Sequence, residues 1–186
     1  LSHPTHGCVL LNGTDIHKNK KAIEGVLGFV AQDDLLIEEL TVYQNLYYGA
    51  KLSFASKKEE ELRHLVDERL KMLGLYEVRN LRVGSLLDKK ISGGQRKRLN
   101  IALSLIREPS ILLLDEPTSG LDPVSRDELL DIFEYLSKQG VAILFSTHIT
   151  SDLEKCADCI TYIRQGKIIS SKKKADFIAD YPCLLY

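Results

Sequence analysis

Two short stretches of this 186-residue sequence carry residues suited to phosphate chemistry, and they lie close together in the chain. The first, Ser92 to Gln95, places two glycines at the start of a basic, amphipathic helix. Glycines there leave backbone N–H groups and the positive end of the helix dipole open to an anion. The second is an apolar run that ends in Asp115 and Glu116. One of these carboxylates can hold a hydrated Mg²⁺ while the other orients or deprotonates a water.

Each stretch also has a purely structural interpretation. Ser92 and Gln95 fit a capping box, in which each side chain satisfies the backbone N–H of the other residue. Asp115 and Glu116 can instead be two solvated acids that open a loop. The residues that follow them, 117–122 (PTSGLD), continue a second pattern, and this favours the chemical interpretation of the acids.

Gln32 and His148 are placed to join the two acids. Gln32 ends a predicted strand at 27–31, and His148 follows a predicted strand at 141–147. In open α/β sheets, ligands bind beyond the carboxyl ends of the strands, where the two acids also fall. A histidine at a strand end is usually incidental on its own. Its placement parallel to two acids predicts a catalytic or sensing role.

The elements that position these residues follow from apolar periodicity and turn residues. Buried parallel strands are unbroken apolar runs. The pattern predicts a hairpin at 8–16, a strand at 27–31, helices from Thr41 to about Leu52 and over 57–73, a strand at 111–114, a helix at 123–139, a strand at 141–146, a hairpin at 159–170 and a short terminal helix. A strand, a helix and a strand in succession form a βαβ unit, so we expect an α/β fold around a parallel sheet.

Two of the helices have candidate site residues at their starts. Ser92 begins a helix, and Asp122 caps the helix at 123–139, which Gly140 ends. The apolar spacing predicts these buried faces: Leu99, Ala102, Leu103 and Ile106 on the first helix, and Leu129, Phe133 and Leu136 on the second.

Composition excludes several other classes of function. The 25 basic and 26 acidic residues give a net charge of −1, so no overall field marks a nucleic-acid or membrane-surface binder. The apolar runs are strand-sized and too short to cross a bilayer. Residues 1–10 have neither an initiating Met nor the features of a signal peptide, so the chain has the character of an internal segment.

The four cysteines are few and scattered, which favours a reduced, cytosolic state. Cys156 and Cys159 form a C-x-x-C pair, but no second cysteine pair or spaced histidine pair completes a zinc site. We interpret the pair as residues that pack on a helix.

Taken together, the motifs resemble the nucleotide-binding domain of ABC (ATP-binding cassette) transporters. The run ISGGQRKRLNIALSLIREPSILLLDEPTSGLD resembles the family signature followed by Walker B and the D-loop. FSTH resembles the switch-histidine segment, and FVAQDD resembles the Q-loop. The resemblance implies a P-loop NTPase (RecA-like) parallel sheet with a helical signature subdomain and peripheral antiparallel strands. Residues 1–186 would then form a single partial domain, with 1–34 and 108–186 as catalytic core and 35–107 as helical subdomain.

The resemblance implies a role for each candidate residue. Asp115 would hold Mg²⁺ through water, Glu116 would be the general base for the attacking water, and His148 would contact the γ-phosphate. Gln32 would link metal and water to the helical subdomain. Asp122, with residues 119–121, would cross the interface of a head-to-tail dimer. Contacts to the γ-phosphate of an ATP held mainly by the partner domain would come from Ser92, Gly93, Gly94 and Gln95.

The family's Walker A string, G-x-x-x-x-G-K-[ST], does not occur in this sequence. The resemblance places the strand, loop and helix of that motif upstream of Leu1, so we expect the fold to lack them. Too few donors then remain to neutralise a triphosphate. We expect this chain by itself to bind ATP weakly, not to turn it over, and to expose apolar strand edges.

The resemblance implies an ATPase that couples hydrolysis to transport, with a second nucleotide-binding domain and a transmembrane permease domain as partners and no nucleic acid. Residues 35–55 resemble the transporter-type segment near the Q-loop, most of all in cassettes of ABC-2 type exporters, including G-type half-transporters. The domain would lie in the cytoplasm, on the cytoplasmic face of the cell membrane. Two alternatives are a soluble ABC ATPase of translation or DNA maintenance and a catalytically silent regulatory cassette. The joint presence of Asp115, Glu116 and His148 argues against the silent cassette.

Overall fold

The computed structural model describes residues 4–19, 23, 25–32, 35–85, 88 and 90–181. Its centre is a three-stranded sheet in the order β3 (Leu27–Val30), β4 (Ile111–Leu114) and β5 (Ala142–Phe145). Both pairings are parallel, and Leu114 lies between Val30 and Phe145 in the register. The three strands therefore end at one common edge, and the predicted α/β fold with a parallel sheet is confirmed.

The two faces of this sheet have different surroundings. Val30, Leu112 and Leu114 are buried in the core, and the ring of Phe145 packs on that of Phe133 at 5.8 Å. On the other side of the strands, Phe29 is 55% and Leu144 is 67% exposed. Parallel sheets are normally covered on both faces. This sheet therefore has an incompletely covered apolar face, which is distinct from the exposed strand edges expected from the sequence, and those stay a prediction.

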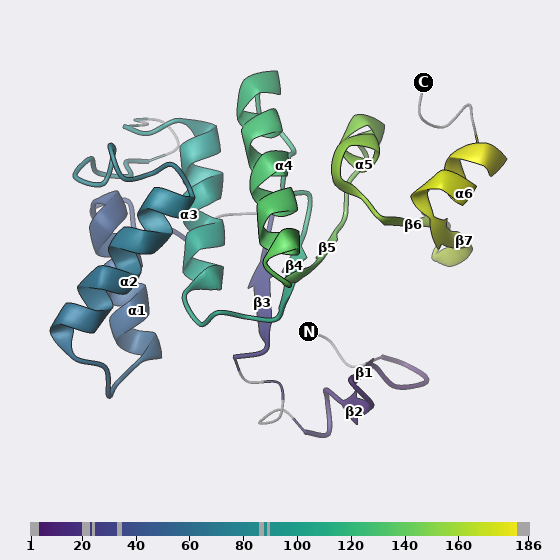
Figure 1. Ribbon diagram of the computed structural model, residues 1–186, viewed down its shortest axis with the longest axis horizontal. Helices are drawn as coiled ribbons and strands as arrows, with labels where there is room; N and C mark the ends of the chain where they lie inside the picture. Colours follow the sequence, from purple (N-terminus) through teal and green to yellow (C-terminus); the bar gives the residue numbers. More distant parts are fainter. Residues whose placement is uncertain are drawn as a thin grey trace.

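Of the four longer helices, α3 (Gly93–Leu105) and α4 (Pro123–Lys138) pack on the strands, and α1 (Val42–Ser53) and α2 (Glu59–Met72) pack on α3. Figure 1 shows α1, α2 and α3 together at one end of the molecule, with α4 beside the sheet. Thr41 caps α1 in a capping box with Gln44. One continuous core joins the helices to the sheet, with Leu46, Leu70 and Leu99 fully buried. Starts and ends agree with the sequence pattern to within two residues.

The predicted buried faces of α3 and α4 are present. On α4, Leu129, Phe133 and Leu136 are buried, and Gly140 follows the helix with φ of +89°. That left-handed conformation suits glycine, which has no Cβ to clash. On α3, Leu99 and Ala102 and the following Ile106 are buried, whereas Leu103 is half-buried.

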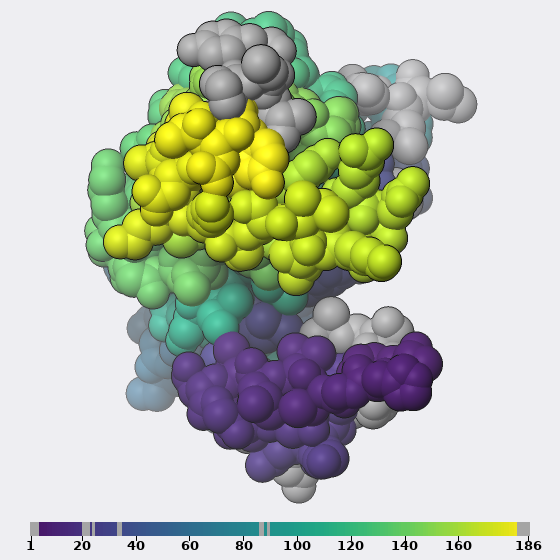
Figure 2. Space-filling view, turned by 90° about the vertical axis from the view of Figure 1, so that its right-hand side faces the viewer, coloured from purple at the N-terminus to yellow at the C-terminus, as the bar shows by residue number. Residues whose placement is uncertain are grey.

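Two antiparallel hairpins complete the fold. β1 (Leu10–Leu11) and β2 (Thr14–Asp15) meet at Asn12-Gly13, where both residues have positive φ as in a type I′ turn. β6 (Cys159–Arg164) and β7 (Lys167–Lys173) form the second hairpin, and α6 (Lys174–Asp180) follows it. In Figure 2 the N-terminal residues (purple) and the second hairpin (yellow-green) lie on one face of the molecule with an open recess between them.

A short helix, α5 (Thr150–Cys156), connects β5 to β6; the apolar pattern gave no bounds for it, although Cys156 was expected to pack on a helix. Cys156 ends this helix and is half-buried, and the burial raises the pKa of its thiol to about 11. Cys159 begins β6 and is exposed, so the prediction that both cysteines pack on a helix is wrong for Cys159. Cys183 lies outside the described residues. None of the described helices has the length and apolarity needed to span a bilayer.

Candidate functional site

Four of the residues predicted to take part in catalysis or metal binding follow the three central strands at the same edge of the sheet. Gln32 comes two residues after β3, Asp115 and Glu116 follow β4 directly, and His148 comes three residues after β5. Because the strands are parallel neighbours, this sequence order places the residues at their shared carboxyl edge.

Glu116 and His148 are in direct contact. Glu116 Oε2 lies 2.8 Å from His148 Nδ1. The Glu116 side chain is 24% exposed and that of His148 is 69% exposed, so the pair is open to solvent on the histidine side. Glu116 also has a φ of +44°, a left-handed conformation that is uncommon for a residue with a Cβ. Strain of this kind persists only where the surroundings hold it in place.

Ser146 links the two acids, a role that the sequence motifs did not indicate. Its hydroxyl donates to Asp115 Oδ1 at 2.7 Å and accepts from the Glu116 backbone N–H at 3.0 Å. It therefore fixes the backbone of Glu116 and one oxygen of Asp115 at once. A hydroxyl residue two positions before His148, directly after a strand, was the only signal that could have indicated it.

The oxygen donors at this edge fit a hydrated Mg²⁺. Asp115 is exposed and its Oδ1 accepts from Ser146; Gln32, which follows the neighbouring strand β3, is also exposed. The described residues hold no cluster of three or more His, Cys, Asp or Glu side chains that could enclose a metal. Mg²⁺ usually keeps several waters and takes one or two protein carboxylates together with substrate phosphates. An exposed aspartate at a strand end suits that coordination better than an all-protein metal site.

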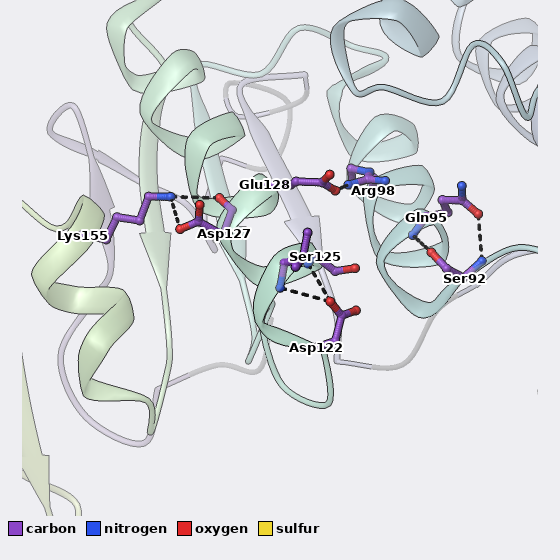
Figure 3. A network of polar contacts seen from close by, with 9 residues as sticks. Ser92, Gln95, Arg98, Asp122, Ser125, Asp127, Glu128 and Lys155 are labelled. Carbon is purple, nitrogen blue, oxygen red and sulfur yellow. Dashed lines mark hydrogen bonds and ion pairs between the residues drawn. The ribbon is translucent and has the colours of Figure 1, made fainter.

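Ser92 and Gln95 form the predicted capping box at the start of α3 (Figure 3). Ser92 Oγ accepts from the Gln95 N–H at 3.1 Å, and Gln95 Oε1 accepts from the Ser92 N–H at 2.8 Å. First-turn N–H groups of a helix have no intrahelical carbonyl to bond. The box therefore satisfies two donors and leaves those of Gly93 and Gly94 to other partners.

The two glycines of this segment have different surroundings. A Cβ on Gly93 would be 4.0 Å from its nearest neighbour, Leu121 Cδ2, and the residue is exposed. A Cβ on Gly94 would lie 2.6 Å from Ser125 Oγ, and Gly94 is buried. Gly94 thus allows α3 to approach α4, which is a packing reason for this glycine that the sequence did not indicate. Its part in binding phosphate stays a prediction.

Asp122 caps α4 beside this contact (Figure 3). Its Oδ1 accepts from the N–H groups of Val124 and Ser125 at 3.1 and 3.0 Å. Hydrogen bonds from Ser125, first through its side chain and then its N–H, lower the pKa of Asp122. An ion pair between Arg98 and Glu128 also joins α3 to α4. The first turns of α3 and α4 therefore lie together, and their candidate residues form a second group beside that at the sheet edge.

The sequence model of the ABC transporter family matches residues 1–119, more than half of the chain. The chain belongs to the ABC transporter family. Its relatives include an ABC-type transporter, claG, of Penicillium crustosum, which is 38% identical over 79% of this chain and 20% of its own length. The broad substrate specificity ATP-binding cassette transporter ABCG2 of Rattus norvegicus is 37% identical over 97% of this chain and 28% of its own length. ABC transporter G family member 28 of Arabidopsis thaliana is 37% identical over 94% of this chain and 16% of its own length.

This ABC transporter chain thus spans between 16% and 28% of the length of these relatives. A solved structure with a similar fold is cbiO1 of Clostridium perfringens, described as part of the ABC transporter complex cbiONQ. It superposes with a TM-score of 0.83 and 29% sequence identity, over 97% of this chain and 71% of that one. The similarity extends through the central sheet and its helices and confirms the P-loop NTPase fold class.

Proposed function

We propose that the full-length polypeptide carrying this chain hydrolyses Mg-ATP to drive transport across a membrane. The observation that carries the proposal is the 2.8 Å contact between Glu116 and His148, next to Asp115 at the carboxyl edge of the sheet. A general base must lie within hydrogen-bond reach of the water it activates, and a partly exposed carboxylate at this edge satisfies that requirement. Membership of the ABC transporter family supplies ATP as the substrate.

Glu116 would take the proton from the attacking water. His148, bonded to the same carboxylate, would orient Glu116 and contact the terminal phosphate. Ser146 would keep the Glu116 backbone fixed while its hydroxyl aligns Asp115. Asp115 and Gln32 would hold Mg²⁺, which supplies charge neutralisation on the phosphate oxygens when bound.

The starts of α3 and α4 would serve an ATP held mainly by a second cassette. The first-turn N–H groups at Gly93, with the hydroxyl of Ser92 and the amide of Gln95, match the donors that a terminal phosphate accepts from. Asp122 lies beside them at the start of the neighbouring helix. Two chains arranged head to tail would thus complete each other's sites.

A transmembrane permease domain is the partner proposed for residues 35–107, the helical subdomain. This chain covers only 28% and 16% of two relatives named as transporters, and the cbiO1 structure is described as part of a transporter complex. The cassette would then lie on the cytoplasmic face of the membrane. Similarity to ABCG2 and to a plant G family member favours the exporter branch of the family.

Phosphate release by the purified full-length polypeptide tests this proposal. We expect release that requires both ATP and Mg²⁺ and that stops when EDTA removes the metal. An Asp115→Ala variant should lose most of the activity because the carboxylate that orients the metal is gone, whereas a Glu134→Ala variant, which removes a half-buried carboxylate of α4 paired with Lys138, should keep it. The absence of Mg-dependent phosphate release from the unmodified polypeptide would contradict the proposal.

A further inference from the structure

A buried acid that is not one of the proposed catalytic residues is bonded to the chain segments next to them. Asp152 lies in the first turn of α5 and is fully buried. Its Oδ2 accepts from the hydroxyl of Thr118 at 2.6 Å, across 34 positions of sequence. Thr118 is also fully buried and lies two residues after Glu116. The carboxylate thus anchors the turn that begins at the proposed general base.

The carboxylate of Asp152 also contacts the segment that carries His148, the partner of Glu116. The hydroxyl of Thr147, the residue before His148, lies 3.4 Å from Asp152 Oδ2. Thr147 Oγ1 in turn accepts from the Ile149 N–H at 3.0 Å, which fixes the chain on both sides of the histidine. One acid is therefore connected to the segments that carry both Glu116 and His148.

Ordinary helix capping does not account for this acid. The N-cap residue of α5, Ile149, has its N–H bonded to Thr147, and Asp152 makes its side-chain bonds outside the helix. In the described part of the chain, Asp152 Oδ1 is buried with no hydrogen-bond partner. A buried polar atom without a partner is destabilising, and an apolar pair of similar shape is often as stable as a buried polar pair. Stability alone therefore does not explain an acid here.

The strained backbone conformation of Glu116 gives a reason for a buried acid at position 152. Its φ of +44° must be held from both sides. Ser146 bonds the Glu116 N–H on one side, and Asp152 holds Thr118 on the other. The helix that carries Asp152 is itself fixed to α4 by Lys155, whose ammonium lies 2.7 Å from Asp131 and also pairs with Asp127 (Figure 3). The segment from Ser146 to Lys155 is thus bonded both to the turn that carries the proposed base and to α4.

We propose that Asp152 is a positioning residue of the hydrolytic site. Through Thr118 and Thr147 it holds the turn after Glu116 and the residue before His148 at a fixed separation, so that the two side chains meet. Asp152 touches no reacting atom in this role. The inference rests on the proposed ATPase function, and it adds a residue that works through the backbone of the catalytic pair.

A double variant separates this role from a contribution to folding. In the full-length polypeptide, Thr118→Val with Asp152→Leu replaces both partners of the bond by apolar groups and also removes the unpaired Asp152 Oδ1, while the half-buried Thr147 hydroxyl keeps its bond from the Ile149 N–H. We expect a thermal midpoint close to that of the unmodified protein, and a KM for ATP within about twofold of it. We expect kcat to fall by at least about 10-fold, because the base is no longer held in place. Glu154→Leu, on the exposed side of the same helix, is the matched control and should leave kcat unchanged.

The single variants at Thr118 give a second test that does not depend on the stability of the double variant. Thr118→Ser keeps the hydroxyl and should restore kcat relative to Thr118→Val, at equal KM. Equal kcat in the double variant and the unmodified protein, or in Thr118→Val and Thr118→Ser, would overturn the positioning role. A lack of ATP hydrolysis in the unmodified protein would instead contradict the proposed function itself, so the two failures are distinguishable.

Discussion

At the scale of single residues, Gly93 and Gly94 are adjacent but should respond differently to substitution. Gly94→Ala would place a Cβ 2.6 Å from Ser125 Oγ, which forces α3 away from α4. We expect a loss of stability of about 1–3 kcal/mol, the usual range for overpacking. Gly93→Ala has room for its Cβ and should change the free energy of unfolding by no more than about 1 kcal/mol. Chemical denaturation of the two variants measures the difference.

A compensating change provides the control for this comparison. Ser125→Gly removes the atoms that a Cβ on Gly94 would meet, so Gly94→Ala should cost less stability in that background than alone. Equal denaturation midpoints for Gly93→Ala and Gly94→Ala would contradict the packing role of Gly94. If Gly93→Ala leaves the denaturation midpoint unchanged, any effect of this variant on ATP hydrolysis reflects the site and not the fold.

The sequence predicted the residues at the strand ends, because apolar runs mark where strands finish and polar residues there share one edge. Glu116 and His148 were expected near each other on this reasoning, and they are in contact. Ser146 and Asp152 could not be predicted in the same way. Their bonds to Asp115 and Thr118 join residues more than 30 positions apart, and only the register of β4 and β5 brings those positions together.

At the scale of elements, the start of α4 should be sensitive to acid. Its cap, Asp122, has a lowered pKa in the folded chain because of hydrogen bonds from Ser125 and Val124. The ionised cap therefore stabilises the fold above the ordinary value of 3.8, and this contribution is lost as the pH falls through the lowered pKa. Asn caps helices well but does not titrate. We therefore compare the free energy of unfolding of the unmodified protein with that of Asp122→Asn by urea denaturation. As the pH is lowered from 6 to below 3.8, the unmodified protein should lose stability relative to the variant. A constant difference across that range would contradict this assignment of the cap.

The longer helices and the central strands followed from sequence because each combines an apolar pattern with clear stop and start residues. Thr41, Ser92 and Asp122 cap the helices that were expected at these positions. The bounds of α5 were not predicted because its 7 residues make fewer than two full turns, too few to show an apolar stripe. Cys159 begins β6, as the hairpin predicted at 159–170 requires, so only the interpretation of Cys159 as packing on a helix was wrong.

At the scale of the whole molecule, the uncovered side of the sheet should make this chain associate with itself. Phe29 and Leu144 are more than half exposed there, and β5 pairs with β4 alone among the described strands. Exposed apolar strand surfaces favour association. We expect light scattering to give a solution mass above the 21.0 kDa of one chain, and a lower mass for a Phe29→Thr, Leu144→Thr variant. A mass of one chain for the unmodified protein at high concentration would contradict this expectation.

The most direct test of the proposed hydrolytic site is the Glu116→Gln variant of the full-length polypeptide. Gln keeps the shape of the side chain but cannot accept the proton of the attacking water. The site geometry predicts that this variant still binds Mg-ATP with nearly unchanged affinity while its rate of phosphate release falls by about 10²-fold or more. Phosphate release by Glu116→Gln at the rate of the unmodified protein would show that Glu116 is not the base.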